Sequence, residues 1–293
     1  MPSAIVLCAG FGTRLRPLTD ELPKPLVPVG DRSILEHALD TLSRAGFREV
    51  VINVHHLPAA FRDVVARATV PVRVVVEAEI RGTAGGVSGA REQLTQAPVL
   101  VWNGDIVVQP PTDELLARSQ PDSVCLAVAA RPLGQGTVGL DELGRVVRLR
   151  GERFGVELQG GDYTGVLTLG ADVQQALPER GCLIGDTLLP RLRAGGTVLS
   201  APVTGAWSDA GDPRSLLAVN LAWLAERALE SFVGEGAEVD PAVELRRALV
   251  GRGARVRGAG RLERCVVCAG ATATAPLEDA IVLPSGRVMR AHV

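Results

Sequence analysis

The C-terminal part of the chain contains an internal repeat, and this repeat restricts the possible folds more than any other feature of the sequence. V-G-E-G-A-E-V begins at Val233, V-G-R-G-A-R-V at Val250 and V-C-A-G-A-T-A at Val267, so the copies begin at equal intervals along the chain. From Val233 onward, apolar residues also recur every six positions within a copy. Six-residue steps that end in tight turns are typical of a left-handed parallel β-helix with one apolar residue per face pointing inward. We therefore predict a short left-handed β-helix domain over residues 232–293.

A second restricting feature is the stretch from Leu7 to Val29, which reads L-C-A-G-F-G-T-R-L-R-P-L-T-D-E-L-P-K-P-L-V-P-V. The apolar run Ala4 to Leu7 precedes it and predicts a buried parallel strand. The run ends in Gly10 and Gly12, which let the backbone approach a ligand closely and offer bare N–H groups to a phosphate chain. The stretch therefore predicts a phosphate-binding loop after the first strand.

Two basic residues in this stretch suit phosphate as well. Arg14 carries a planar fork of donors that can grip phosphate through two hydrogen bonds. Lys24 is the only lysine among the 31 lysines and arginines of the chain, and prolines stand on both sides of it. A lone lysine in a chain that otherwise uses arginine indicates a need for a compact point charge on a stiff loop.

These two blocks are similar to the signature of the sugar-nucleotidyltransferase (nucleoside-diphosphate-sugar pyrophosphorylase) family, G-x-G-T-R-L-x-P-L-T followed by P-K-P-L-x-P-V. The resemblance implies transfer of a nucleotidyl group from a nucleoside triphosphate (NTP) to a sugar-1-phosphate, with release of pyrophosphate. It also implies that Arg14 and Lys24 are the catalytic residues. The nucleotide contacts that it implies in this stretch are Leu7, Ala9, Gly10, Gly12 and Thr13.

The order of elements after the signature predicts the fold class. Ser33 can cap a helix that ends before Gly46, and a second helix is expected over Leu57 to Ala68. Strands are expected over Glu49 to Val54 and Val70 to Val76. This βαβαβ order predicts an α/β domain with a Rossmann-like, mostly parallel sheet and with ligands at the carboxyl ends of its strands. We place this nucleotidyltransferase domain at residues 1–231.

A glycine-rich turn follows the third strand. The sequence E-A-E-I-R-G-T-A-G-G begins at Glu77 and opens a helix through Val87 to Leu94. Thr83 can cap this helix, and the small residues from Gly82 to Gly86 leave room for a planar base. The family uses a similar turn to read the nucleobase, which implies nucleotide contacts by Glu77, Gly82 and Thr83.

Two aspartates are placed to hold Mg²⁺. N-G-D, Asn103 to Asp105, follows the fourth strand, Val99 to Trp102, and a carboxylate at that strand end suits a hard cation. Asp105 matches the metal aspartate of the family, and Asn103 and Gly104 are further nucleotide contacts. W-S-D-A-G-D-P resembles the family motif W-x-D-x-G-T-P, which makes Asp209 the second metal carboxylate. Asp212, where threonine is frequent, can equally cap the next helix.

The sugar side of the site departs from the family pattern. Y-T-G-V resembles the turn in which a glycine approaches the sugar ring, so Thr164 and Gly165 are predicted sugar contacts. Many members carry a second lysine before this turn, and this chain has none. Arg150 or Arg153 can substitute for that lysine, and Glu152 can meet sugar hydroxyls. Solvated charges in a loop explain these three residues equally well.

Composition excludes several classes of protein. A net charge of −2 and an aromatic content of 3% argue against nucleic-acid binding. No apolar run approaches the ~20 residues of a membrane helix, and the N-terminus shows no signal-peptide pattern. The five scattered cysteines predict reduced thiols in the cytoplasm. Cys265 and Cys268 form C-x-x-C, but they occupy repeat positions, so we interpret them as repeat filler.

The substrate pair is the least determined part of the prediction. The G-T-A-G-G turn, N-V-H-H-L and the β-helical tail are most similar to mannose-1-phosphate guanylyltransferases, which predicts GTP and mannose-1-phosphate. Uridylyl- or thymidylyltransferases acting on N-acetylmuramate-1-phosphate or glucose-1-phosphate, and a non-catalytic nucleotide-sugar sensor, are alternatives. An acyltransferase needs a histidine between coils, and the segment offers only His292. Because β-helical coils stack readily, we expect homo-oligomers.

Overall fold

The computed structural model describes residues 2–291, so His292 lies outside the described residues. The chain divides into two compact units. The first unit comprises Met1–Gly10 and Ala38–Trp207, and the second comprises Phe11–His37 and Ser208–Val293. The predicted boundary between residues 231 and 232 stays a prediction, since the compact units divide the chain at other points. In the described range, no helix combines the length and the apolar character that a bilayer-spanning segment needs.

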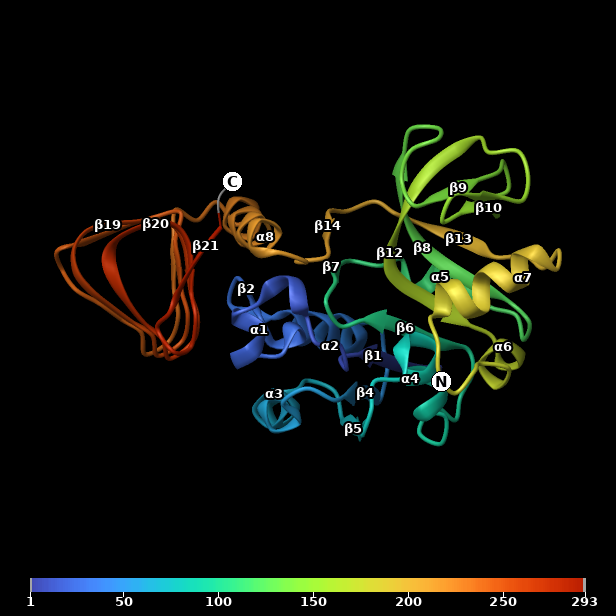
Figure 1. Ribbon diagram of the computed structural model, residues 1–293, viewed down its shortest axis with the longest axis horizontal. Coiled ribbons are helices and arrows are strands. Elements are labelled where there is room, and N and C mark those ends of the chain that lie inside the picture. Colours follow the sequence, from blue (N-terminus) through green and yellow to red (C-terminus); the bar gives the residue numbers. More distant parts are fainter. Residues whose placement is uncertain (1, 292–293) are drawn as a thin grey trace. The chain divides into compact units, whose positions relative to one another are not determined.

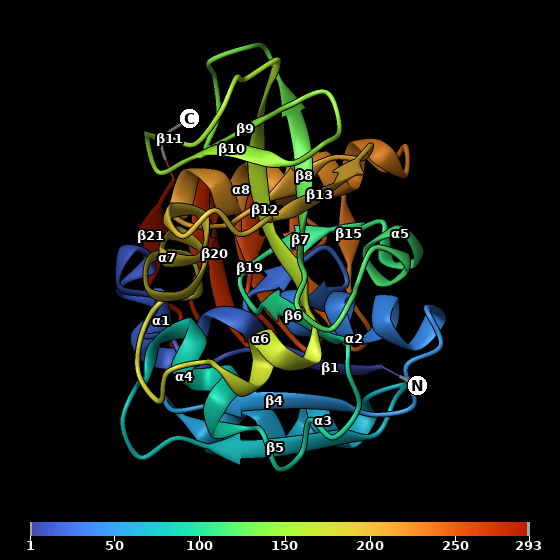
Figure 2. The same ribbon diagram turned by 90° about the vertical axis from the view of Figure 1, so that its right-hand side faces the viewer.

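The first unit is built on a ten-stranded sheet. Its centre and one edge consist of parallel strands in the order β6-β1-β4-β5, which lie side by side in Figure 2. The bounds of these strands are Ser3–Leu7 for β1, Val50–Val54 for β4, Val72–Val76 for β5 and Val99–Asn103 for β6. The predicted α/β fold with its parallel strands is therefore confirmed, and each predicted strand agrees with the observed one to within two residues.

The sheet continues beyond β6 with mainly antiparallel strands. The long strand β12 pairs antiparallel with β6, β8 and β9, and β13 then pairs parallel with β8 (Figure 1). The strands of this half are β8 (Val124–Arg131), β9 (Val138–Leu140), β10 (Val146–Leu149), β11 (Glu152–Arg153), β12 (Gln159–Leu169) and β13 (Leu199–Val203). Two further short strands are β7 (Val107–Val108) and β14 (Trp207–Ser208).

The helices near the sheet follow from local sequence signals. Ser33 and Glu36 form a capping box in front of α2 (Ile34–Arg44), because the Ser33 backbone N–H donates to the Glu36 carboxylate and the Ser33 hydroxyl accepts from the Glu36 N–H. The helix predicted from Leu57 begins as a 3₁₀ turn, η3 (Pro58–Phe61), and continues as α3 (Arg62–Arg67). The others are α4 (Gly82–Gly89), α5 (Thr112–Ala117), α6 (Ala171–Gln175), the π-helical η4 (Leu183–Leu188) and α7 (Leu189–Arg193).

The core of the first unit consists of aliphatic side chains from both halves of the sheet. Buried residues of β1, β6, β8 and β12 pack with the apolar side of α4 and the following turn, where Val87 and Leu94 are buried. Strands β1, β4 and β6 are almost entirely buried, as expected for the central strands of a parallel sheet. The loops at their carboxyl ends are thereby attached to a rigid support.

The second unit contains residues 11–29 of the signature segment together with the last long helix. Its N-terminal part consists of η1 (Thr13–Leu15), α1 (Leu18–Glu21), η2 (Lys24–Leu26), β2 (Pro28–Val29) and β3 (Arg32–Ser33). Helix α8 (Pro213–Glu226) packs on the turn between β2 and β3. Asn220 of α8 is fully buried, accepts from the Gly30 N–H at 2.8 Å and donates to the Pro28 carbonyl at 3.0 Å. One amide side chain thus fixes the turn to the helix.

The repeat region forms stacked turns of parallel strands. Val239 pairs with Val256 and Leu245 pairs with Leu262, so successive turns are offset by one length of the predicted repeat. The next turn is shorter by two residues, because Leu262 pairs with Leu277. The turns have a three-sided outline in Figure 1. The strands are β15 (Phe232–Val233), β16 (Glu238–Val239), β17 (Val243–Arg246), β18 (Leu249–Val250), β19 (Arg255–Val267), β20 (Thr272–Val282) and β21 (Val288–Arg290).

The cysteines of this region pack in its interior. Cys265 and Cys268 are both buried, and burial raises the pKa of these thiols to about 11 and about 12. A thiol with so high a pKa is neither a good nucleophile nor a good metal ligand at neutral pH. Their environment agrees with the interpretation as repeat filler.

Candidate functional site

The first unit collects several predicted residues at one edge of its sheet. Ala9 and Gly10 follow β1, Glu77 follows β5, and N-G-D begins with the last residue of β6, Asn103. Because these strands are parallel, their carboxyl ends share one edge. The Gly104 N–H donates to the Leu7 carbonyl at 2.9 Å, so the loops after β1 and β6 are in direct contact.

A buried hydrogen-bond chain joins three of these strand ends. Asn53, at the end of β4, accepts from the Cys8 N–H at 2.9 Å and donates to the Glu77 carboxylate at 2.7 Å. Glu77 also accepts from the Arg81 N–H at 3.2 Å. Asn53 and Glu77 are 2% and 5% exposed, so the chain is shielded from solvent. It holds the loop after β1 in a fixed position relative to the turn that leads to Gly82.

Asn53 lies beside the candidate site, and the motifs assigned it no predicted role other than its place as the first residue of N-V-H-H-L. A polar amide in the otherwise apolar strand V-V-I-N-V was the available signal, since a buried amide requires partners.

Position 104 requires glycine, because the neighbouring residues Leu7 and Cys8 leave no space for a side chain. A Cβ at this position would lie 2.7 Å from the Leu7 carbonyl oxygen and 2.9 Å from the Cys8 sulfur. Burial, together with the nearby charge of Asp105, raises the pKa of the Cys8 thiol far above its usual range. Cys8 therefore acts as a neutral packing residue beside Asp105.

The glycine-rich helix α4 differs from the prediction in three respects. Thr83 does not cap it: the cap position is occupied by Arg81 without a side-chain hydrogen bond, and the Thr83 hydroxyl accepts from the Leu183 N–H at 2.8 Å. A Cβ at Gly82 would meet the Gly181 carbonyl at 2.4 Å, and one at Gly85 would meet the Glu179 carbonyl at 2.5 Å. The room at these two glycines is thus filled by the chain's own backbone. The helix also ends at Gly89, before the predicted Leu94.

The predicted sugar residues Thr164 and Gly165 lie within strand β12. The register of β12 against β8 shifts between Tyr163 and Leu167, and Gly165 has a φ of +83°, so Y-T-G-V is a bulge in a strand. Thr164 is completely buried and its hydroxyl donates to the Ala127 carbonyl at 3.0 Å. Gly165 faces Asn103, because a Cβ there would lie 3.2 Å from the Asn103 amide nitrogen. The bulge therefore adjoins the N-G-D loop.

The structure shows the surroundings of the three charged residues that were predicted for the sugar side. Glu152 on β11 forms a bidentate ion pair with Arg193, and the hydrogen bonds from Arg193 lower the pKa of Glu152. The Arg150 guanidinium lies 3.4 Å from the Cys182 sulfur. Arg153 is exposed on β11.

The second unit brings the two blocks of the signature together. Gly12 has a φ of +62°, and its carbonyl accepts from the Thr19 hydroxyl at 2.9 Å. A Cβ at Gly12 would lie 2.8 Å from the Thr19 methyl group and 3.1 Å from the Lys24 Cβ. Lys24 is only 6% exposed. The absence of a side chain at Gly12 therefore allows Lys24 to pack closely against the loop that carries Arg14.

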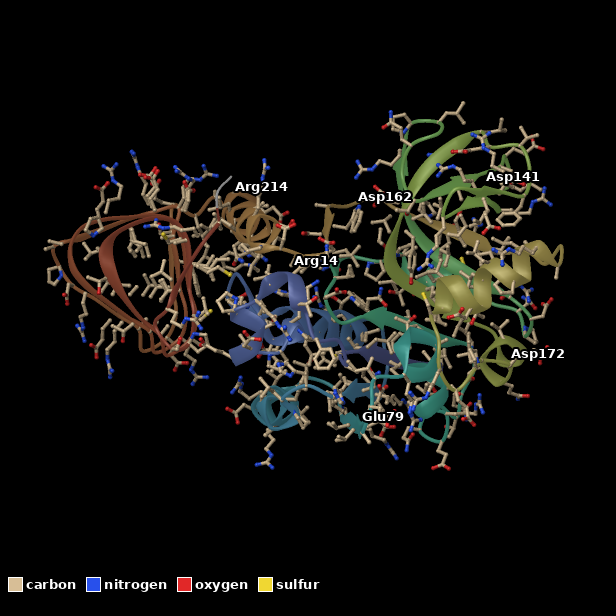
Figure 3. All side chains as sticks on the ribbon, viewed as in Figure 1. Arg14, Glu79, Asp141, Asp162, Asp172 and Arg214 are labelled. Atoms are coloured by element: carbon tan, nitrogen blue, oxygen red, sulfur yellow. The ribbon has the colours of Figure 1, made fainter. Side chains whose placement is uncertain are left out.

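Arg14 also lies near Asp209 of the W-S-D-A-G-D-P motif in this unit. Its guanidinium lies 3.9 Å from the Asp209 carboxylate, and both side chains are largely exposed. Asp209 accepts from the Gly211 N–H at 3.1 Å, and a Cβ at Gly211 would lie 3.0 Å from the Arg14 nitrogens. Gly211 thus leaves space for both charged groups. Figure 3 shows Arg14 in this unit, with Arg214 on the adjoining helix α8.

Asp212 caps helix α8, as predicted. Its carboxylate accepts from the Ser215 N–H at 2.8 Å, and Pro213 occupies the first helical position. The Ser215 hydrogen bond, with a contribution from the Arg14 charge, holds the pKa of Asp212 below its usual range.

The donor chemistry of the two aspartates fits Mg²⁺. Mg²⁺ prefers one or two carboxylates and completes its shell with water and phosphate oxygens, so it needs no protein cage. Among residues 2–291 there is no cluster of three or more histidine, cysteine or acidic side chains that forms such a cage. Asp209 shares one oxygen with a backbone N–H and keeps further lone pairs for a cation. Asp105 belongs to the first unit and Asp209 to the second.

Comparison with known proteins agrees with this set of motifs. The "Nucleotidyl transferase" family model matches residues 3–226. A probable mannose-1-phosphate guanylyltransferase 1 of Oryza sativa subsp. japonica is 28% identical over 226 residues, which cover 73% of this chain and 62% of the relative. The mannose-1-phosphate guanylyltransferase catalytic subunit beta of Danio rerio is 30% identical over 225 residues, with the same shares. The chain thus spans about 62% of the length of these relatives.

A solved structure supports the fold. HddC from Yersinia pseudotuberculosis superposes with a TM-score of 0.64 at 19% identity and covers 76% of this chain and 100% of its own. From the match over residues 3–226, we conclude that the chain belongs to the nucleotidyl transferase family.

Proposed function

We propose that the chain is a sugar-1-phosphate nucleotidyltransferase that makes a nucleoside-diphosphate sugar and pyrophosphate, with GTP and mannose-1-phosphate as its substrates. Family membership supports the reaction type, and relatives named mannose-1-phosphate guanylyltransferases support the substrate pair. The observation that carries the proposal is the meeting of Arg14 with Asp209 in the second unit. It joins a phosphate-binding cation to a metal-binding carboxylate from two distant motifs.

The proposed reaction needs alignment and charge neutralisation. A phosphate monoester has a second pKa near ~6, so the attacking oxygen of the sugar-1-phosphate is already ionised at neutral pH. This oxygen forms a bond to the α-phosphorus while the bond from that phosphorus to the bridging oxygen breaks, and pyrophosphate leaves. No general base is required, and the charge on the phosphates is the main barrier.

Four charged residues share this task in the proposed mechanism. Arg14 grips the β- and γ-phosphates and then the leaving pyrophosphate, while Lys24 neutralises the α-phosphate and the incoming sugar phosphate. Asp105 and Asp209 would hold Mg²⁺, which supplies further charge neutralisation when bound. The nucleotide contacts proposed are Leu7, Ala9, Gly10, Gly12, Thr13, Glu77, Gly82, Thr83, Asn103 and Gly104. The sugar contacts proposed are Glu152, Thr164 and Gly165.

The C-terminal region is proposed to be a left-handed parallel β-helix spanning residues 232–293, after a catalytic domain of residues 1–231. The parallel pairing at an offset of one repeat length supports stacked coils. Strand β16 has a pairing partner on one side only among the described residues, in β19, so an edge of the stack is open. An open edge of this kind can pair with another chain, which supports the proposal of a homo-oligomer. Location in the cytoplasm stays a prediction.

A substrate grid tests the proposal. Pyrophosphate release is measured with GTP, ATP, UTP and dTTP against mannose-, glucose- and N-acetylmuramate-1-phosphate in the presence of Mg²⁺. We expect the highest kcat/KM with GTP and mannose-1-phosphate. A strong preference for UTP or dTTP over GTP would overturn the guanylyl assignment and leave the reaction type intact. No turnover with any pair would favour a nucleotide-sugar sensor.

A further inference from the structure

Arg148 is a buried cation outside all the motifs considered above. It lies on β10 and is 8% exposed. Its Nε and Nη2 donate to the two oxygens of Glu157 at 2.8 and 2.9 Å. Its Nη1 donates to the Gly136 carbonyl, and Nη2 also donates to the carbonyls of Gln135 and Val138, all at 2.9 Å. One guanidinium therefore binds two carbonyls of the loop between β8 and β9 and a third at the start of β9.

The surrounding sequence leaves space for this ion pair. A Cβ at Gly139 would lie 2.5 Å from the Glu157 carboxyl carbon. The Gly134 N–H donates to Glu157 at 3.1 Å, so the carboxylate holds a fourth point of the same loop. The hydrogen bonds that Arg148 donates to Glu157 raise the pKa of Arg148, which keeps the guanidinium charged. A buried ion pair adds little net stability because desolvation offsets its attraction, so fixing the loop geometry is the better account of its role.

The loop held by Arg148 is connected directly to the strand with the proposed sugar contacts. The Thr137 N–H donates to Asp162 at 3.1 Å, and Asp162 forms an ion pair with Arg131 at 2.6 Å. The Tyr163 N–H donates to the Thr137 hydroxyl at 2.9 Å. Tyr163 immediately precedes Thr164 in the β12 bulge. Figure 3 shows Asp162 in the β8–β12 region of the first unit.

We propose that Arg148 is a positioning residue for the sugar-phosphate substrate: by clamping the loop 134–138, it fixes the β12 bulge at Tyr163–Gly165 in the geometry that receives the sugar. This inference rests on the proposed function. Arg148 would thus support the sugar side of a site that lacks the second lysine of the family. It would do so through the loop and would not bind the phosphate itself. The pairing of β12 with β8 is interrupted between Tyr163 and Leu167, so a contact from outside the strand pair, such as the hydrogen bond from Tyr163 to Thr137, helps to fix the bulge.

The test compares Arg148→Lys with Arg145→Lys. Lysine keeps the charge of Arg148 but cannot reach two carboxylate oxygens and three carbonyls from one flat group. Arg145 is the matched control, because it lies next to the same hairpin and pairs with Asp141 on the surface. The substrates are GTP and mannose-1-phosphate, or the best pair from the substrate grid. Initial rates give kcat and both KM values, and backbone amide exchange is followed at residues 134–138 and 163–165.

We expect Arg148→Lys to raise the KM for the sugar-1-phosphate by about tenfold, with the KM for the NTP changed less than about twofold, since misplacement of one substrate is costly. Amide exchange at Tyr163–Gly165 should accelerate in Arg148→Lys and stay at the wild-type rate in Arg145→Lys. A folded Arg148→Lys with wild-type KM values overturns the inference, as does unchanged exchange in the bulge. An inactive wild-type protein refutes the proposed function instead, and the exchange data then still decide whether Arg148 clamps the bulge.

If Arg148→Lys does not fold, Glu157→Gln replaces it. Glutamine keeps the shape and one acceptor oxygen while it removes the charge that holds Arg148. The same rise in the sugar-phosphate KM is expected, and wild-type values in this variant contradict the inference.

Discussion

The guanidinium of Arg14 lies 3.9 Å from the carboxylate of Asp209, although one stands in the first motif of the chain and the other in the last. Gly211 makes this approach possible, because any side chain there would collide with both groups. In the proposed mechanism, a triphosphate would give Arg14 a stronger anionic partner and would leave the Asp209 carboxylate to a cation.

Asp209→Asn tests the carboxylate side of this pair. We expect kcat to fall by about 100-fold or more, because asparagine keeps the size but loses the charge that holds a cation. The activity should recover only in part when the Mg²⁺ concentration is raised. Initial rates over a Mg²⁺ series measure both effects. The matched control is Asp212→Asn, which should retain near-wild-type activity because asparagine caps helices as well as aspartate does. Equal losses in both variants would point to a folding defect.

Lys24→Arg tests whether a compact point charge is needed. We expect loss of most of the activity. The Lys24 side chain is 6% exposed and packs against Gly12, so the space that it occupies is too narrow for the wider guanidinium of arginine. The measurement is kcat/KM for both substrates, with a thermal melt to confirm folding. Arg16→Lys is the control, since Arg16 is exposed and pairs with Asp20 on the surface. Near-full activity of Lys24→Arg argues against the point-charge interpretation.

Local signals allowed much of the fold to be predicted. Ser33 and Asp212 stand before apolar helical patterns and both cap helices in the structure. The repeat that begins at Val233 reappears in the pairing offset of the C-terminal strands. These features depend on residues close in sequence or on strict repetition, so the sequence alone contains the necessary information.

Long-range packing could not be predicted from the same signals. Thr83 resembles a cap, but its hydroxyl binds the Leu183 N–H from a segment 100 positions away. Gly82 and Gly85 of α4 have no space for a side chain because the backbone near Gly181 passes over them, and no local pattern indicates which distant segment does so. Asn53 and Arg148 were missed for the same reason: their partners come from other strands and loops.

Gly30→Ala should destabilise the second unit. A Cβ at Gly30 would lie 2.0 Å from the Trp223 ring, and the residue also has a φ of +66°. Overpacking costs about 1–3 kcal/mol, and the strained backbone adds to this. Urea or thermal unfolding followed by tryptophan fluorescence measures the loss. Gly46→Ala is the matched control, with a φ of +84° but open space around it, so it should lose only the backbone part, about 1 kcal/mol. Similar losses in the two variants would exclude the clash as the cause.

Cys182 should be the most reactive of the five cysteines. Burial alone would raise its pKa, but N–H donors of Gly185 and Ile184, together with Thr83 and Arg150, lower it below the usual value. The other four thiols are buried. We expect one equivalent of an aromatic disulfide reagent to react quickly at pH 7 and the rest only on unfolding. Cys182→Ser should remove the fast phase, and Cys265→Ser should not. A fast phase that survives in Cys182→Ser contradicts the assignment.

The contribution of Asp212 to the stability of the protein should decrease as the pH becomes acidic. Its pKa in the folded state is lowered from the ordinary value of 3.8 by the Ser215 hydrogen bond and by Arg14. A group with a depressed folded-state pKa stabilises fully above its unfolded-state pKa and loses this contribution as the pH falls through the folded-state value. The melting temperature of the wild type should therefore approach that of Asp212→Asn as the pH falls from 5 to below about 3.8. Parallel melting curves of the two proteins across this range would show that the carboxylate charge at the helix start contributes nothing.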